Sequence, residues 1–185
     1  MPTNTIVRSF LTCVLSLCLS GWSLGSSASA ETIVVTTDLD IANPPFNTGG
    51  LCGSGTVADL PGADGEVSLS EAIRAANNTP GEKSITFAPS LGGATIVLTG
   101  PLYLCGGHTT LNGDIDGDKT PDVIIDGAAV TLPFHVIGVV SSHNTVKNLE
   151  VLALAHNPEV AGISVSATPA VATTVMDNTI THPQS

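Results

Sequence analysis

Aromatic residues are scarce in this chain, and so are basic ones. Phenylalanine, tryptophan and tyrosine make up 3% of the 185 residues. Few rings are therefore available to stack on sugars, which argues against a lectin-like site. Five lysines and arginines oppose sixteen aspartates and glutamates, for a formal net charge of −11. So acidic a surface repels phosphate backbones and has no basic cluster to attract them, so we expect no nucleic-acid partner.

Long apolar runs are also missing, except near the start of the chain. Residues 1–30 contain one charge, Arg8, then an apolar run over residues 10–19 and the small residues Ala28-Ser29-Ala30. This pattern predicts a secretory signal peptide that is cleaved after about Ala30. The run is shorter than the roughly 20 residues of a transmembrane helix. We therefore expect no transmembrane segment, a secreted or cell-surface location, and one domain over residues 31–185.

Only two of the four cysteines, Cys52 and Cys105, lie beyond this leader. In an oxidising compartment two such thiols usually form a disulfide. A metal-binding or catalytic role would need a companion. The sequence contains no CxxC pair, and only His108 stands near either cysteine. A disulfide is the expectation.

Residues 68–78 form the only convincing amphipathic helix after the leader. Ser68 and Glu71 have the spacing of a capping box, in which each side chain accepts a hydrogen bond from a free amide at the helix start. Leu69, Ala72, Ile73 and Ala76 fall on one face. Such a helix either caps the end of a strand array or packs on the surface of another β-fold.

The rest of the chain reads as short apolar strands bounded by Gly, Pro or Asn-Gly. A loop rich in Gly, Pro, Asn and Asp covers residues 38–67, and its length makes a pin such as a disulfide reasonable. The predicted strands cover residues 32–36, 84–87, 94–98, 102–104, 109–111 and 123–125.

A weak internal repeat runs through the last third of the chain. A shift of 29 positions places Val136 over Val165, Thr145-Val146 over Thr174-Val175, and Val151 over Ile180. A period of this size with short strands and no helix suits one coil of a parallel β-solenoid, whose coils bury their side chains by stacking. An antiparallel β-sandwich is the alternative. The repeat favours the solenoid, and so does the helix, because the first coil needs a cover.

The order of these segments resembles the CSLREA-type N-terminal region of bacterial right-handed β-helix surface proteins. The resemblance covers about residues 32–130. It rests on Cys52 in a Gly-rich loop, then Val-Ser-Leu-Ser-Glu-Ala-Ile-Arg-Ala-Ala-Asn (67–77), Ile-Thr-Phe-Ala-Pro-Ser-Leu (85–91), Thr-Leu-Asn-Gly (110–113) and Ile-Ile-Asp-Gly (124–127).

The resemblance implies an all-β, right-handed parallel β-helix of the pectin-lyase-like type with an N-terminal capping α-helix. Such chains are secreted or displayed on the cell surface, often as the front of a longer protein, and have no established general activity. The family usually has cysteine where this chain has Ser68, and arginine where it has Ser70. The common pairing of the loop with the helix start is therefore absent, so Cys52 either bridges to Cys105 or stays free.

Residues 113–122 are the best candidate for a site. The carboxylates of Asp114, Asp116, Asp118 and Asp122 can converge from one tight loop on a hard cation such as Ca²⁺. The pattern is similar to the aspartate loops of calcium-binding repeats. However, Lys119 replaces the usual Gly, and Asp126 is the only substitute for the missing bidentate Glu. The alternative is a solvated acidic turn.

Catalysis within these residues is not expected. Polysaccharide lyases need a poised base, and hydrolases need paired carboxylates. The only candidates on the coils, Lys147, Glu150 and Asp177, make no convincing pair. The five histidines lack zinc-ligand spacing. Residues Asn144, Asn148 and Asn178 fit structural ladders of stacked side chains.

Two hypotheses follow. The first is a non-enzymatic β-helix module with a structural or adhesive role and an extracellular polysaccharide or protein as partner. The second is the N-terminal part of a carbohydrate-active β-helix enzyme, a polysaccharide lyase or hydrolase, whose catalytic coils lie beyond Ser185. Both hypotheses expect the chain to stop inside the solenoid.

Overall fold

The computed structural model describes residues 29–130, 135–153, 161–167 and 171–181, and strands dominate these residues. The helices are α1 (Leu69–Asn77) and the short 3-10 turns η1 (Gly50–Cys52), η2 (Val57–Asp59) and η3 (Pro89–Leu91). Within the described ranges, none of these helices has the length and hydrophobicity needed to span a bilayer. The strands are β1 (Glu31–Val35), β2 (Lys83–Phe87), β3 (Thr95–Val97), β4 (Leu102–Leu104), β5 (Thr109–Asn112), β6 (Ile124–Asp126), β7 (His135–Val139), β8 (Thr145–Lys147), β9 (Glu150–Leu152), β10 (Ala161–Val165), β11 (Thr174–Met176) and β12 (Thr179–Thr181).

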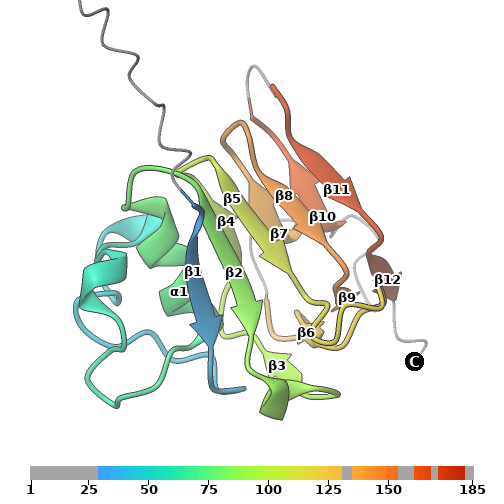
Figure 1. Cartoon of the computed structure of the whole chain (residues 1–185), viewed down its shortest axis with the longest axis horizontal. Coiled ribbons are helices and arrows are strands. Elements are labelled where there is room, and N and C mark those ends of the chain that lie inside the picture. Colours follow the sequence, from blue (N-terminus) through green and yellow to red (C-terminus); the bar gives the residue numbers. More distant parts are fainter. Residues whose placement is uncertain (1–28, 131–134, 154–160, 168–170, 182–185) are drawn as a thin grey trace, which may run out of the picture.

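The strands form three parallel sheets (Figure 1). Sheet A has the order β1-β2-β5-β8-β11, sheet B the order β12-β9-β6-β3, and sheet C the order β10-β7-β4. From β2 onwards, consecutive strands belong to sheets A, B and C in turn, and the next strand returns to sheet A. The expected all-β class is confirmed. The antiparallel sandwich is wrong, because the strand pairings described are parallel.

Aliphatic side chains at the same register position stack from strand to strand. In sheet A, Ile85 pairs with Leu111, and Leu111 pairs with Val146. All three side chains are fully buried. Short strands of period two bury one face in this way, and each buried aliphatic side chain contributes about 1.5–3 kcal/mol. The core is therefore a set of aliphatic columns that run through the stack.

The register confirms part of the 29-residue repeat and corrects the rest. Thr174 pairs with Thr145, and Ile180 pairs with Val151, each 29 positions apart. The placement of Val136 over Val165 is wrong, because Val165 pairs with Val139, 26 positions earlier. The connection that follows β10 is three residues longer than the one that follows β7. Loops absorb such insertions, whereas strand register follows the buried face.

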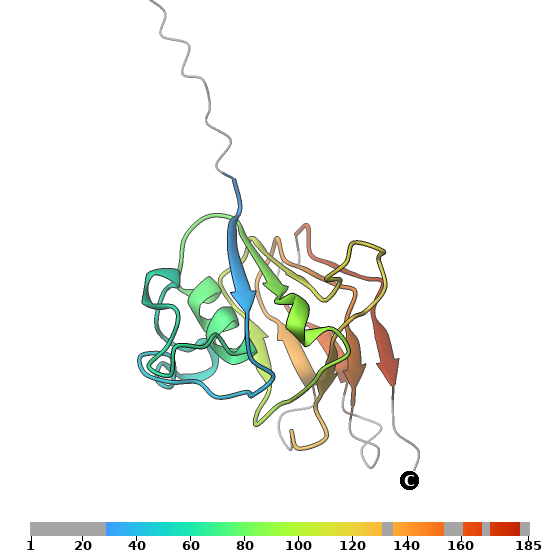
Figure 2. The ribbon, with the colours of Figure 1, turned by 60° about the horizontal axis from the view of Figure 1, so that its bottom comes forward.

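Helix α1 closes one end of the stack, where it packs against β1, β2 and β4 (Figures 1 and 2). Leu69 and Ile73 on its apolar face are buried in the common core. The expected capping box is present: the Ser68 hydroxyl accepts from the Glu71 amide at 3.2 Å, and the Glu71 carboxylate accepts from the Ser68 amide at 3.2 Å. The helix is thus a cover for the core and not a peripheral addition.

The long loop over residues 38–67 is held against α1 by polar side chains of the helix. The Glu71 carboxylate accepts from the Asn43 amide at 2.8 Å, and Arg74 donates to the Phe46 carbonyl. Ser70 donates to the carboxylate of Asp40, which is itself buried. The helix therefore uses its apolar face for the core and its polar face for the loop.

Candidate functional site

The aspartate loop, residues 113–122, leaves the stack between β5 and β6. Leu111 on β5 pairs with Val146, 35 positions later, whereas Ile125 on β6 pairs with Val151, 26 positions later. The connection between β5 and β6 is therefore nine residues longer than the one between β8 and β9, the neighbouring strands in the same two sheets. The loop is an insertion into a turn that elsewhere needs only two residues, Asn148 and Leu149.

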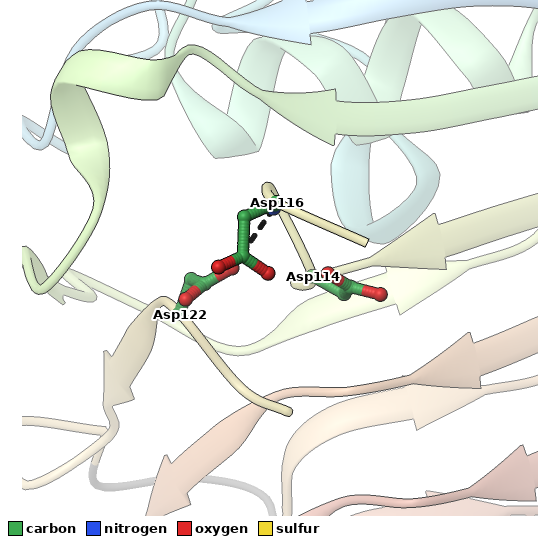
Figure 3. A group of neighbouring side chains, drawn as sticks. All are labelled: Asp114, Asp116 and Asp122. Carbon is green, nitrogen blue, oxygen red and sulfur yellow. Dashed lines mark hydrogen bonds between the residues drawn. The ribbon is translucent and has the colours of Figure 1, made fainter. Parts of the chain in front are cut away.

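Three of the four expected aspartates come together in this loop (Figure 3). Asp114, Asp116 and Asp122 each offer one carboxylate oxygen, and these oxygens all lie within 4.8 Å of one another. Asp116 is exposed, while Asp114 and Asp122 are partly buried. This group could hold a metal ion.

The fourth aspartate, Asp118, is not part of this group. Its carboxylate accepts from the Thr120 hydroxyl at 2.6 Å and from the Thr120 amide at 2.7 Å. These bonds, the hydroxyl bond first, lower the pKa of Asp118. Asp126 also lies outside the group, and its carboxylate accepts from the Ala128 amide at 2.8 Å. Both carboxylates accept from groups two positions later in the sequence, as aspartates in turns commonly do.

Backbone amides surround the clustered carboxylates. One Asp122 oxygen accepts from the Ile115 amide at 2.6 Å and from the Asp116 amide at 3.3 Å. The two Asp114 oxygens accept from the Gly117 amide at 2.6 Å and the Lys119 amide at 3.1 Å. The partly positive amide hydrogens offset part of the repulsion among the aspartates.

The backbone of the loop turns at two positions of positive φ, Gly117 at 89° and Lys119 at 71°. Lysine adopts this left-handed conformation at a cost that glycine does not have. The sequence comparison with calcium loops placed a glycine where Lys119 stands, and the structure makes the turn nonetheless. Lys119 therefore does not prevent the loop from closing around the aspartates.

The chemistry of the group suits a hard cation. Ca²⁺ takes six to eight oxygen ligands, and Mg²⁺ takes six in strict octahedral geometry with several waters. Three carboxylates from one exposed loop supply only part of either shell, so water or backbone carbonyls would complete it. Within the described residues, this is the only group of His, Cys, Asp or Glu side chains with such geometry.

The expected disulfide is confirmed between Cys52 and Cys105, with an S–S distance of 2.06 Å and a Cα separation of 5.8 Å. It connects the loop beside α1 with the chain that follows β4. Asn77, at the end of α1, binds both sides of it: its amide group donates to the Cys52 and Tyr103 carbonyls, at 3.2 and 2.8 Å. Its carbonyl oxygen accepts from the Cys105 amide at 2.8 Å. The sequence did not single out Asn77, because these partners are distant along the chain.

The asparagines of the coils bind mainly to backbone. Asn148 is the exception, because its side-chain amide donates to the side chain of Asn112 at 2.9 Å. Asn144 accepts from the Thr109 amide at 3.1 Å. Asn178 donates to the Val146 carbonyl at 2.9 Å. These bonds connect residues in or beside neighbouring strands of sheet A, so their role is structural.

The candidates for catalysis lie at strand ends and in a turn. Lys147 ends β8, Glu150 begins β9, and Asp177 lies between β11 and β12 with a φ of 54°. In the part of the chain that the structure describes, no hydrogen bond or ion pair connects these three side chains. These three described residues therefore form no catalytic pair with one another.

Two ring contacts involve histidines. His108 and His143 stack face to face, with ring centroids 4.6 Å apart and an angle of 5° between the planes. His135 meets Tyr103 edge to face at 5.1 Å, and burial lowers the pKa of His135. These ring contacts were not predictable from the sequence, because each ring meets a partner more than 30 positions away.

The chain was compared with protein-family models, with curated proteins and with solved structures, and none of them matches it.

Proposed function

We propose that this chain is the capped N-terminal end of a right-handed parallel β-helix that acts as a secreted or cell-surface module with a structural and adhesive role. The observation that carries the proposal is the succession of strands, which visit sheets A, B and C in turn from β2 to β12. Each set of three strands is then one coil, and α1 covers the first coil. The resemblance of residues 32–130 to CSLREA-type regions supports the same assignment.

Export is part of this proposal. The leader pattern in residues 1–30 supports it, and the Cys52–Cys105 disulfide is compatible with an extracellular protein. The chain is expressed in a bacterial host, and the exported product is sequenced from its N-terminus. A first residue at or near Glu31 is expected. A chain that keeps residues 1–30 and stays inside the cell would contradict export.

The adhesive role is tested with beads that carry the purified chain through an added C-terminal tag. Beads are washed over immobilised polygalacturonate and over immobilised fibrinogen, as one extracellular polysaccharide and one extracellular protein. Retention above that of uncoated beads on either surface is expected. The same polygalacturonate is assayed for unsaturated uronate products and for new reducing ends. Release of either product by this chain would instead support the carbohydrate-active enzyme.

We further propose Ca²⁺ as the cation of the aspartate loop, with Asp114, Asp116 and Asp122 as its protein ligands. Ca²⁺ accepts varied arrangements of oxygen ligands, whereas Mg²⁺ demands near-ideal octahedral geometry, so three carboxylates from one loop suit Ca²⁺ better. The support is the geometry of the group, in which one carboxylate oxygen of each aspartate lies within 4.8 Å of the other two. A cation that binds only the folded chain stabilises it by about 2.7 kcal/mol at a hundredfold excess over Kd.

The test compares thermal melts in millimolar calcium and in chelator for two matched variants. Asp116→Asn removes a carboxylate of the group, whereas Asp118→Asn removes one outside it, from the same loop and with the same change of charge. Calcium is expected to raise the Tm of the wild type and of Asp118→Asn, but not of Asp116→Asn. Equal shifts in all three chains, or none in the wild type, would leave a solvated acidic turn.

A further inference from the structure

Two histidine rings stack beside sheet A, outside the aspartate loop. His108 lies in the turn before β5 and His143 in the turn before β8, and β5 and β8 are neighbours in sheet A (Figure 1). Both side chains are exposed. Their ring centroids are 4.6 Å apart, and their planes differ by 5°. Two imidazoles from distant parts of the sequence therefore face solvent as a pair.

The backbone explains why the two rings are parallel. Thr110 pairs with Thr145, and each histidine stands two positions before its threonine. Both histidines have the left-handed conformation, with φ of 53° and 61°. Side chains with the same register and the same backbone conformation leave the chain in the same direction. Ala172, two positions before Thr174 on β11, has a φ of 50°, so this turn does not itself require histidine.

The ring nitrogens of the pair are accessible to a ligand. The rings meet through their faces, which leaves the nitrogens at the ring edges open. Within the ranges that the structure describes, no hydrogen bond is made by a ring nitrogen of either histidine. By contrast, the side chain of Asn144, the residue after His143, binds the backbone of Thr109 and Ser141. Neutral imidazole is the commonest protein ligand of metal ions and suits zinc, nickel and copper.

The separation of the rings is within reach of one metal ion. Zinc binds an imidazole nitrogen at about 2.0–2.1 Å, so two nitrogens on one ion lie at most about 4.2 Å apart. The ring centroids are 4.6 Å apart, and exposed imidazole rings turn readily about χ2. A small rotation therefore brings one nitrogen of each ring within this limit. Water fills the other ligand positions, because the pair is exposed.

The charges around the pair favour a cation. Glu82, which is exposed, immediately precedes β2, and the amide of the next residue, Lys83, donates to the His108 carbonyl at 2.9 Å. The ammonium group of Lys83 is buried and donates to the carbonyls of Thr79 and Gly81. A carboxylate therefore stands beside the turn, while the neighbouring lysine is held elsewhere. The formal net charge of −11 raises the concentration of cations near the chain further.

We propose that His108 and His143 form a binding site for a divalent transition metal ion such as Zn²⁺, with one nitrogen of each ring as ligands. The site differs in chemistry from the aspartate loop, because carboxylate oxygens suit calcium whereas imidazole suits zinc. The inference goes beyond the proposed function and does not depend on it.

The experiment titrates zinc chloride into the purified full chain, prepared without a histidine tag, and follows binding by calorimetry. The wild type is expected to bind one zinc ion at its tightest site. His143→Gln removes one ligand and should weaken this binding by about tenfold or more. His135→Gln is the matched control, because it makes the same substitution outside the pair and should bind zinc as the wild type does. Asp116→Asn, which alters the aspartate loop, should also bind zinc unchanged.

A second measurement needs no variant. In NMR spectra of the imidazole nitrogens, zinc should shift the signals of His108 and His143 and leave those of His135 in place. A wild type that binds no zinc, or a His143→Gln variant that keeps the full affinity, would overturn the proposal. So would loss of zinc binding in Asp116→Asn, which would assign the ion to the aspartate loop.

Discussion

The two ends of the stack differ in how far the apolar core is covered. At one end, a helix with an apolar face covers the core, and Leu69 and Ile73 are almost wholly buried. At the other, open end, Val175 and Ile180 stack on the buried side chains of Val146 and Val151 and are themselves half-exposed. Neighbouring parallel strands bury one another's side chains, but a strand at the edge of a sheet has such a neighbour on one side only. Among the described residues, a covering helix lies only at the end formed by β1, β2 and β4.

The largest effect is expected from a buried charge under the cap. Ile73→Asp removes a side chain that is 1% exposed and places a carboxylate in the core. We expect it to lower the free energy of unfolding by about 5 kcal/mol. The matched variant Ile180→Asp, at the open end, should cost less than about 1 kcal/mol.

Both variants are measured by urea unfolding. A cost of similar size at the two positions would contradict the contrast between a covered end and an open one.

The next effect is expected from the disulfide that fastens the cap. Cys52 and Cys105 are 53 residues apart, and on the chain-entropy view a bridge of this span contributes about 4 kcal/mol. The double variant Cys52→Ser/Cys105→Ser should lose that amount in urea unfolding. An unfolding midpoint within error of the wild type would show that the loop over residues 38–67 is held by hydrogen bonds alone.

A smaller effect is expected at the start of α1. The Ser68 hydroxyl accepts from the Glu71 amide, so Ser68→Ala leaves a buried donor unpaired and should cost about 1 kcal/mol. Ser164→Ala on β10, at the open end, removes a hydroxyl from a partly buried position and should change stability by less than about 0.5 kcal/mol. Thermal melts of the two variants make the comparison, which fails if their order is reversed.

The smallest effect is expected from pH, at the start of β7. Burial, in a site where the ring contacts Tyr103, lowers the pKa of His135 below its ordinary value of about 6.5. The unfolded chain therefore takes up a proton first as the pH falls, so stability is full above about 6.5 and declines below it. His135→Gln should flatten the pH dependence of Tm between about pH 7.5 and 5.5. An unchanged slope in that variant would contradict the prediction.

Local pattern was enough to locate most of the framework. The helix predicted over residues 68–78 is α1 (Leu69–Asn77), and the strand predicted over residues 123–125 is β6 (Ile124–Asp126) within one residue. Alternating β-branched residues between glycine-rich turns carry this information, because strand and helix periods differ. The disulfide was also predictable, since only two cysteines follow the leader.

What depended on distant partners was not predictable. Val165 pairs with Val139 and not with Val136, because the connection after β10 is longer than the one after β7. The apolar pattern does not reveal this difference in loop length. Asn77 connects both sides of the disulfide through bonds to residues 25 to 28 positions away. The Asp118 carboxylate binds Thr120, two positions later, although Asp116 stands two positions earlier, and spacing alone does not decide between the two.

The disulfide has a mechanical consequence. Helix α1 and strands β2, β3 and β4 all lie between Cys52 and Cys105 in the sequence, so a force applied to the two ends of the chain cannot extend them. Pulling would peel β12, β11 and β10 from the open end, one edge at a time, and the extension would halt at the bridge. Reduction would then release a further 53 residues, about 180 Å of extended chain. The Cys52–Cys105 disulfide therefore sets how far the chain can be extended before it is reduced.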